Sequence, residues 1–444
     1  MEGNLNTSQI KRVAVKCEDR SENFKYQTSD KNFQRQFAHI YSERLLTLRP
    51  KLEKAVKEVF DLPIYKLKDL QTNKRCVIIG TLFKSMQLRP TILKEISEEN
   101  DIPPQPMDCY IDESDELYLE DEVQRIILVG NIKASDYVTG VTTAIVGLEK
   151  EEDHGKFYVE EVFELPLPEQ RAKPSLSDDM WIAFVSGLDL DGANDDLVSL
   201  QLLVDYLTGI LGCDEDQAKI SKITRCIFAG NCLNAATVDK NSVQKAKYLS
   251  KKSTSGSLEA MRELDHFLSQ IVSNMNVTLL PGKNDPANYA LPQQQFHKCM
   301  FPSAGKNTNF HLTTNPCSLN IHGFDVLGHS GTPLHNISEY SSLKSDTSLL
   351  FKTLKWRHLA PTAPDTLACY PLFNRDPFIV ETTPHIFFSG NHDRLQHKIF
   401  EENGKEVLLL GLPRFSVTKT FALVNLKTYE VCPVTIDTCI EESS

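Results

Sequence analysis

Four apolar runs in the chain beyond residue 180 each end in a polar turn that contains glycine. The run His385–Phe388 passes through Ser389-Gly390 into an amide, an imidazole and a carboxylate. In open α/β sheets the carboxyl ends of neighbouring strands gather at one edge, where functional groups collect. We therefore expect an α/β domain with its chemistry, if any, at these turns. The four turns are Ser186-Gly187-Leu188-Asp189, Gly230-Asn231, Gly282-Lys283-Asn284-Asp285 and Gly390-Asn391-His392-Asp393.

A chain of 444 residues is too long to fold around one hydrophobic core of ordinary size, so at least two domains are expected. Short strand-like runs fill the first part, and five strands in a segment of this size predict a small barrel such as an OB fold. After a proline-containing linker, strands and helices alternate. The predicted fold is α/β (α+β overall). Its parts are a flexible tail at 1–29, a helical segment at 30–60, the OB-fold domain at 61–170, the α/β domain at 178–436 and a tail at 437–444.

The helical segment carries an apolar stripe from Phe33 to Leu48, and Leu52 to Phe60 continue it. Arg35, Glu43 and Arg44 lie off the stripe. Arg49-Pro50 interrupts the pattern, because proline ends helices and suits the first turn of a new one. We predict a helical hairpin, packed either on its own domain or on a partner.

The charge distribution bears on nucleic-acid binding. The chain has a net charge of −12, and residues 61–170 alone hold 11 Lys and Arg against 23 Asp and Glu. Nonspecific nucleic-acid binding needs basic surface, so this barrel is expected to bind protein instead. Tyr110, Tyr118 and Tyr137 could stack on bases, but they stand among acidic residues.

Several classes of protein are excluded by composition. No run of 18 apolar residues is present, so no membrane association is expected. The 11 cysteines are scattered, without a pair at zinc spacing, which predicts free thiols and no cofactor.

The order of the glycine turns resembles that of the calcineurin-like metallophosphoesterases. Those enzymes present Asp-x-His, Gly-Asp, Gly-Asn-His-Asp, a lone His and Gly-His-x-His, which hold two divalent ions that generate a hydroxide. The resemblance implies an inactive phosphoesterase domain, because an amide cannot bridge two cations and an ammonium repels them. The residues at the ligand positions are Gly187, Asp189, Asn231, Lys283, Asn284, His358, Asn391 and Asp393, of which His358 keeps the lone His.

His392 falls between ligand positions in this alignment. A rebuilt metal site from Asp189, His358, His392 and Asp393 stays open as an alternative. His358 is otherwise expected to be a hydrogen-bonded core histidine.

Longer stretches resemble the B-subunits of replicative DNA polymerases, and among them the small (second) subunits of DNA polymerase delta. The resemblance runs from about Phe33 to about Val434. It is carried by Phe33–Arg44, Gly80-Thr81-Leu82-Phe83-Lys84, Leu119–Ile126, Ala246–Leu249, Asp285–Gln294, Arg357–Leu367 and Asp376-Pro377-Phe378.

This resemblance implies a nuclear, non-catalytic scaffold that joins the C-terminal domain of the catalytic subunit to the extended, clamp-binding third subunit. A small fourth subunit and polymerase zeta are further implied partners, DNA is reached only through the complex, and the metals belong to the catalytic subunit. The segment Phe33–Phe60 and the cleft between the two domains are candidate interfaces. Two alternatives remain: an active metal-dependent phosphodiesterase or 3′–5′ exonuclease, and a single-strand-binding OB module.

Overall fold

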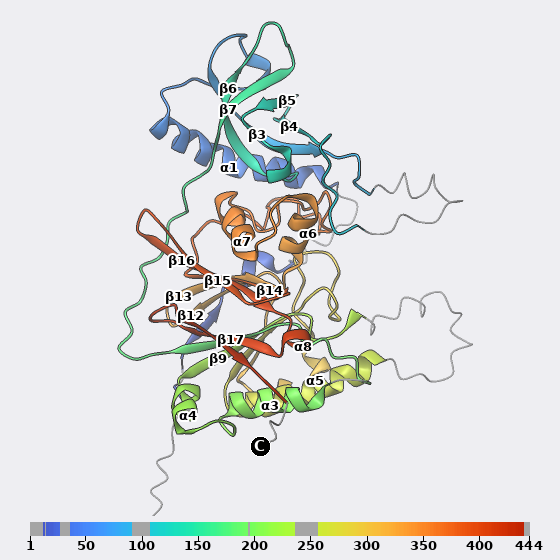
Figure 1. The fold of residues 1–444 in the computed structure, drawn as a ribbon, viewed down its shortest axis with the longest axis vertical. Helices are drawn as coiled ribbons and strands as arrows, with labels where there is room; N and C mark the ends of the chain where they lie inside the picture. Colours follow the sequence, from blue (N-terminus) through green and yellow to red (C-terminus); the bar gives the residue numbers. More distant parts are fainter. Residues whose placement is uncertain are drawn as a thin grey trace, which may run out of the picture.

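The computed structural model describes residues 12–13, 15–26, 36–90, 107–193, 196–235 and 256–438. The molecule is elongated, with a barrel at one end and an α/β domain below it (Figure 1). The fold class is the predicted one, α/β with an OB-fold domain and an N-terminal helix. No helix in the described ranges is long and apolar enough to cross a membrane. Of the stretches that carry the resemblance, Ala246–Leu249 and the first residues of Phe33–Arg44 lie outside the described residues.

The predicted helical hairpin is wrong, because α1 runs without a break from Ala38 to Val59 with Pro50 inside it. A proline within a helix costs about 3 kcal/mol or more. Leu45, Leu52 and Val56 are buried, and full burial of such a side chain contributes about 1.5–3 kcal/mol. Packing of three side chains on the barrel therefore outweighs the interruption. Their partners on the barrel are Val77, Ile79, Ala144 and Val146.

The barrel is one sheet in the order β2-β3-β4-β5-β7-β6, closed by pairing of β3 with β6. Gly80 lies mid-strand where a Cβ would be 2.4 Å from the Glu120 carbonyl oxygen, so the absence of a side chain permits the close approach of β4. The strands are β2 Ile64–Tyr65, β3 Cys76–Ser85, β4 Glu116–Glu120, β5 Arg125–Gly130, β6 Thr142–Glu149 and β7 Lys156–Phe163.

The α/β domain consists of two six-stranded sheets with an apolar core between them. One sheet has the order β11-β10-β9-β8-β17-β18, and α3, α4 and α5 pack on its outer face. Its strands are β8 Trp181–Val185, β9 Ile223–Ala229, β10 Asn276–Leu280, β11 Phe310–Leu312, β17 Thr420–Asn425 and β18 Val431–Thr435, and its helices are α3 Leu197–Thr208, α4 Asp214–Ser221 and α5 Gly256–Val272.

The other sheet, β1-β12-β13-β14-β16-β15, faces the barrel through α6 and α7 (Figure 1). The sequence predicts alternating strands and helices here, and the structure has the helices α6 and α7 in succession between β13 and β14. The elements are β12 Cys317–Ile321, β13 Phe324–His329, β14 Ile386–His392, β15 Gln396–Glu402, β16 Lys405–Pro413, α6 Thr332–Tyr340, α7 Asp346–Lys355 and α8 Phe415–Thr418.

The prediction of a flexible tail at 1–29 is wrong for residues 12–13 and 15–26. Strand β1, Cys17–Asp19, pairs antiparallel with β12 at the edge of the second sheet. A short 3₁₀ helix, Ser21–Phe24, follows it, and Phe24 is buried in the core. Arg12 reaches the other sheet, where it donates to the Ile223 carbonyl of β9 at 3.1 Å, and it also donates to the Leu207 carbonyl of α3 at 2.8 Å. Three residues carry no readable period, so the sequence could not reveal a strand that is held by a sheet edge.

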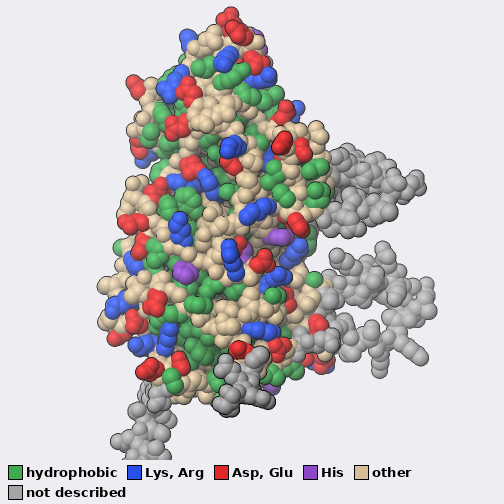
Figure 2. Space-filling view, viewed as in Figure 1, with side chains coloured by type: hydrophobic (Ala, Val, Ile, Leu, Met, Phe, Trp, Pro, Cys, Tyr) green, Lys and Arg blue, Asp and Glu red, His purple; other side chains and the backbone are tan. Residues whose placement is uncertain are grey.

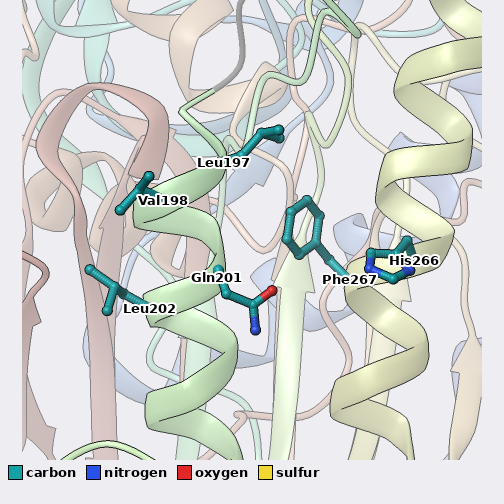
Figure 3. Close-up of a pocket in the computed structure, with 6 residues that line it drawn as sticks. All are labelled: Leu197, Val198, Gln201, Leu202, His266 and Phe267. Atoms are coloured by element: carbon teal, nitrogen blue, oxygen red, sulfur yellow. The ribbon is translucent and has the colours of Figure 1, made fainter.

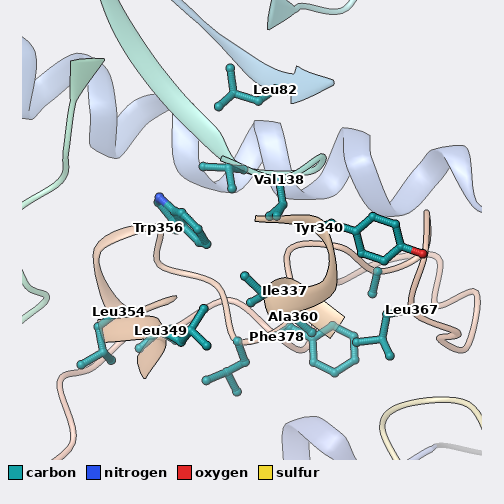
Figure 4. Close-up of a cluster of buried hydrophobic side chains, with 14 of the residues drawn as sticks. Leu82, Val138, Ile337, Tyr340, Leu349, Leu354, Trp356, Ala360, Leu367 and Phe378 are labelled. Atoms are coloured by element: carbon teal, nitrogen blue, oxygen red, sulfur yellow. The ribbon is translucent and has the colours of Figure 1, made fainter. Parts of the chain in front are cut away.

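One hydrophobic cluster spans the boundary between barrel and α/β domain (Figure 4). Leu82 and Val138 from the barrel side lie above Ile337, Tyr340 and Trp356 of the α/β domain. The boundary at α6 and α7 is therefore a packed joint. The sequence suggested a cleft there as a candidate interface, and this part of it is filled by side chains of the chain itself.

Candidate functional site: the strand-end turns and the domain joint

The turns after β8, β9 and β10 meet the end of β14, as the sequence predicts, but Gly390, Asn391 and His392 belong to β14 itself, which has a register shift between Ser389 and His392, and do not form the predicted turn after it. The Gly187 N–H donates to the Gly230 carbonyl at 3.1 Å. A Cβ at Gly230 would be 2.8 Å from the Gly282 Cα, and a Cβ at Gly390 would be 2.6 Å from the Ala229 carbonyl oxygen. The glycines therefore let the turn backbones pack directly against one another.

The amide of Asn391 ties three of these strand ends together. Its Nδ2 donates to the Ala229 carbonyl at 3.1 Å and to the Ser330 carbonyl at 2.7 Å. Its backbone N–H donates to Ser186 Oγ at 3.0 Å. A histidine ligand belongs at this position in the metallophosphoesterase pattern. Here a neutral donor is aimed at carbonyl oxygens.

The turn after β10 is held by acceptors that serve its own backbone. Asp285 accepts from the Gly282 N–H at 2.7 Å and from the Leu233 N–H at 2.9 Å. Burial raises the pKa of Asp285 to about 6, against the effect of these backbone donors. Asn231 Oδ1 accepts from the Asn284 N–H at 3.2 Å. The side-chain oxygens of Asp285 and Asn231 thus accept hydrogen bonds from peptide N–H groups.

The charged residues at the predicted ligand positions have separate surroundings and share no hydrogen-bond or ion-pair partner in the described part of the chain. Asp189 accepts from Ser416 Oγ at 2.7 Å, and burial raises its pKa. Lys283 is exposed, and the Asp393 side chain is 94% exposed beside Arg414 at 3.3 Å. Throughout the described part of the chain, no three His, Cys, Asp or Glu side chains form a group that could hold a metal ion.

His358 does not belong to this group: it is the hydrogen-bonded core histidine that the sequence also led us to expect, which corrects its placement among the ligand positions. Its Nδ1 accepts from the Ala360 N–H at 3.1 Å, so its Nε2–H donates to Asp376 Oδ2 at 2.8 Å. Burial, with a smaller effect of Arg44, lowers the pKa of His358 to about 4. Helix α7 begins beside His392 and ends near His358, a length of about 15 Å at 1.5 Å per residue. The rebuilt metal site that needs both histidines is therefore wrong.

His392 forms a chain of hydrogen bonds that resembles a hydrolase triad. Its Nδ1 lies 2.8 Å from Asp346 Oδ1, and its Nε2 lies 2.7 Å from Ser389 Oγ. Ser389 is 0% exposed, so no substrate carbonyl can reach the hydroxyl. These bonds fix the start of α7 against β14.

A fifth strand end, the turn Gly328-His329-Ser330-Gly331 after β13, was missing from the predicted set. A Cβ at Gly331 would be 2.1 Å from the Gly390 carbonyl oxygen. His329 is fully buried, and burial, with a smaller effect of His392, lowers its pKa to about 3. The signal is present in the sequence, because this turn also follows an apolar run and contains glycine.

The domain joint contains a second set that the sequence did not reveal, centred on Arg44 of α1. Its Nε donates to Asp376 Oδ2 at 2.8 Å, and the side chain is 0% exposed. Its terminal nitrogens donate to the carbonyls of Gly140, Pro361 and Ala363 at 2.8, 2.9 and 2.8 Å. Arg44 therefore joins α1 and the barrel to the α/β domain.

Gly140 makes this contact possible. Its φ is +92°, and a Cβ there would be 2.0 Å from the Pro361 carbonyl oxygen. A second buried pair, Lys84 with Asp115 at 3.3 Å, also spans the joint, because Lys84 donates to the Tyr340 carbonyl at 2.9 Å.

The three barrel tyrosines that could have stacked on bases are largely engaged. Tyr110 stacks on Tyr340 with ring centroids 5.1 Å apart, and Tyr137 packs near Trp356. The Tyr118 hydroxyl donates to Glu116. In Figure 2 acidic and basic side chains are interspersed on the visible face, without a basic stripe. These contacts disfavour a base-stacking surface on the barrel.

An apolar groove of about 460 Å³ lies between α3 and α5 (Figure 3). Val198 is 62% exposed on its α3 wall, and Leu197 is also exposed. The residues that line it are Leu197, Val198, Gln201, Leu202, His266 and Phe267. Exposed apolar surface of this kind marks protein interaction sites.

Two family models match the chain. The model for the B-type subunits of DNA polymerases alpha and epsilon matches residues 182–398, and the model described as DNA polymerase delta subunit OB-fold domain matches residues 36–162. A solved structure of an archaeal phosphodiesterase matches 58% of this chain and 100% of its own, with 11% identity and a TM-score of 0.27. Similarity that low carries no argument about activity.

Curated relatives match over nearly the whole length. The DNA polymerase delta small subunit of Arabidopsis thaliana is 38% identical over 92% of this chain and 92% of its own. DNA polymerase delta subunit 2 of Drosophila melanogaster is 35% identical over 94% and 97%. The small subunit of Saccharomyces cerevisiae is 32% identical over 90% and 89%.

Proposed function

Because the chain belongs to the family of DNA polymerase delta small subunits and is thus a component of a DNA polymerase complex, we propose that it acts there as a non-catalytic scaffold. In this role it links the C-terminal domain of the catalytic subunit to the extended third subunit. A nuclear location and a shared role in polymerase zeta are part of the proposal.

The observation that carries the proposal is the occupancy of the strand-end turns by their own hydrogen bonds. Asn391, Asn231 and Asp285 use their polar atoms on backbone groups of neighbouring turns. A two-metal hydrolase needs the side chains at its ligand positions free to bind the ions, with an imidazole at the position of Asn391 and a bridging carboxylate at that of Asn231. The turns therefore support a framework role.

The groove between α3 and α5 is the surface we propose for one of the two partners. Burial of apolar side chains is the main source of affinity at such a site, and a carboxylate placed in it must be desolvated. Val198→Glu should weaken the complex with that partner by at least about tenfold and leave the other partner bound.

Val123 offers a matched control, because it is 75% exposed on the barrel. Val123→Glu should leave both affinities unchanged. The measurement is co-purification and titration of the full chain with each partner. The scaffold proposal fails if the unaltered chain forms no stable complex with the catalytic subunit's C-terminal domain at micromolar concentrations.

The competing enzymatic function has its own test. A metal-dependent phosphodiesterase or exonuclease would show bound metal and cleavage of DNA in manganese. We expect neither for the purified chain. Cleavage that survives Asn391→Asp and Asp189→Asn would point to a contaminant, whereas cleavage lost in them would replace the scaffold proposal.

A single-strand-binding function would appear as DNA binding that weakens with salt. We expect no binding by the purified chain even at low salt, because the barrel segment is strongly acidic. Salt-sensitive binding that a barrel substitution abolishes would support this function instead.

A further inference from the structure

A small pocket of about 210 Å³ lies where the linker between the two domains crosses the α/β domain. Its walls come from the linker, from the turn between β15 and β16, and from the turn between β17 and β18. The residues that line it are Gln170, Arg171, Ala172, Lys173, His385, Gly404, Lys405, Glu406 and Tyr429.

The wall formed by the linker is held in place by the half-buried Gln170 and the buried His385. Gln170 Nε2 donates to the Glu406 carbonyl at 2.6 Å, and its Oε1 accepts from the Glu406 N–H at 3.0 Å. His385 is fully buried, and its Nδ1 accepts from the Asp325 N–H at 2.9 Å. Its Nε2–H therefore donates to the Arg171 carbonyl, at 3.0 Å. The pocket is thus formed before any ligand arrives, which lowers the cost of binding.

The lining has an excess of positive charge in a chain of net charge −12. It contains three cations, Arg171, Lys173 and Lys405, and one carboxylate, Glu406. His385 is neutral in the tautomer that its hydrogen bonds require. The excess is local, since residues 61–170 account for a charge of −12 by themselves.

Two of the cations keep most of their donors available. Among the described residues, the Arg171 guanidinium makes one long contact, to Asp325 at 3.5 Å, and Lys405 donates to the Leu167 carbonyl at 2.7 Å. Lys173 is different, because its Nζ lies 3.0 Å from Glu406 Oε2 and 3.4 Å from the centroid of the Tyr429 ring. The Glu406 carboxylate therefore forms an ion pair with Lys173 in the place where an external anion could bind.

We propose that this pocket binds a single phosphate group, held by Arg171 and Lys405 and in competition with Glu406 for Lys173. Arginine and lysine donors on a preformed concave surface match the charge and the several acceptor oxygens of a phosphate. The volume admits one such group. Inorganic phosphate and the phosphate of a nucleoside monophosphate share this chemistry.

The sharpest test is a gain of binding. Glu406→Gln removes the internal anion, keeps the size of the side chain and frees Lys173, so phosphate should bind about tenfold more tightly. Lys405→Met should weaken binding by about tenfold. Glu401→Gln and Lys398→Met, on the neighbouring strand β15, are the matched controls and should change nothing.

The measurement is calorimetric titration of the full chain with sodium phosphate, against chloride at equal ionic strength. A nucleoside monophosphate titrated in parallel distinguishes the two sources of the phosphate group, and tight binding of either supports the site. Equal phosphate affinity in all four variants would overturn the proposal. Binding of a single-stranded oligonucleotide without binding of inorganic phosphate would overturn it as well. If Lys405→Met misfolds, the gain expected for Glu406→Gln decides the matter.

Discussion

The strand-end turns and the domain joint both bury polar groups, but the groups are neutral at the turns and charged at the joint. At the turns, the neutral Asn391 amide donates to peptide carbonyls, and Asn391 Oδ1 and His329 Nε2 are buried without a hydrogen-bond partner among the described residues. At the joint, a guanidinium, a carboxylate and an imidazole meet in Arg44, Asp376 and His358. Desolvation costs a neutral amide less free energy than it costs a charge, so a buried charge depends more strongly on its partners.

This difference suggests which region fixes the shape of the molecule. Loss of one amide at the turns removes local bonds within a single domain. Loss of Arg44 removes a hydrogen-bond donor of one carboxylate and of three carbonyls, and these four acceptors belong to different segments. We therefore expect the joint to be the more fragile region, although it contains no residue of the predicted site other than His358.

The largest effect is expected for Arg44→Met. The substitution leaves Asp376 buried with only His358 as a side-chain partner, and breaking a buried ion pair costs about 3–5 kcal/mol. Urea denaturation should show this loss in the free energy of unfolding. Arg394→Met, at an exposed position, is the control and should change stability by less than about 0.5 kcal/mol.

A double-mutant cycle sharpens the assignment to the pair. Asp376→Asn added to Arg44→Met removes the stranded charge, so the double variant should lose less than the sum of the two single losses. Additive losses would show that Arg44 acts mainly through the three carbonyls.

A smaller effect is expected at the turns from Asn391→Asp. A carboxylate cannot donate to the carbonyls of Ala229 and Ser330, so two hydrogen bonds are replaced by repulsion. We expect a loss of about 1–3 kcal/mol in the free energy of unfolding. Asn391→Gly retains the φ of +65° without the side chain and should lose less than the aspartate variant. If Asn391→Gly is as stable as the unaltered chain, the amide contributes nothing beyond its backbone conformation.

The strand-end turns could be predicted from the sequence because they obey local rules. An apolar run followed by a glycine turn indicates where a strand ends. Because the carboxyl ends of parallel strands lie at one edge of an α/β sheet, such ends are expected to lie close together. The same rule covers His329, whose turn has no counterpart in the known order of ligand motifs and so did not stand out. His358 was misplaced for a related reason, because order along the chain does not fix position in space.

The joint could not be predicted in this way. Arg44 lies beside the apolar stripe of α1, where an arginine normally faces water, and its partners are over 90 residues away in the sequence. The continuity of α1 through Pro50 likewise depends on packing against the barrel. The burial of Arg44 and the continuity of α1 both result from tertiary packing, so the periodicity of residues within the helix cannot predict them.

The most selective effect concerns pH at the turns. The pKa of His329 is lowered from 6.5 to about 3 in the folded chain, so between these values the unfolded chain binds a proton that the folded chain does not. The stability that depends on neutral His329 is therefore complete above pH 6.5 and is lost as the pH falls. Each such group adds about 1.4 kcal/mol per pH unit to the slope.

His329→Asn isolates this contribution, because an asparagine oxygen can replace Nδ1 as the acceptor for the Gly331 N–H. Between pH 6 and 4.5 the variant should lose stability less steeply than the unaltered chain, by about 1.4 kcal/mol per pH unit. His358 and Asp285 titrate in both proteins, Asp285 with the opposite sign because its pKa is raised, so their effects cancel in the difference. Parallel stability curves would mean that His329 reaches water in the folded chain, and the turns would then be more open than the joint.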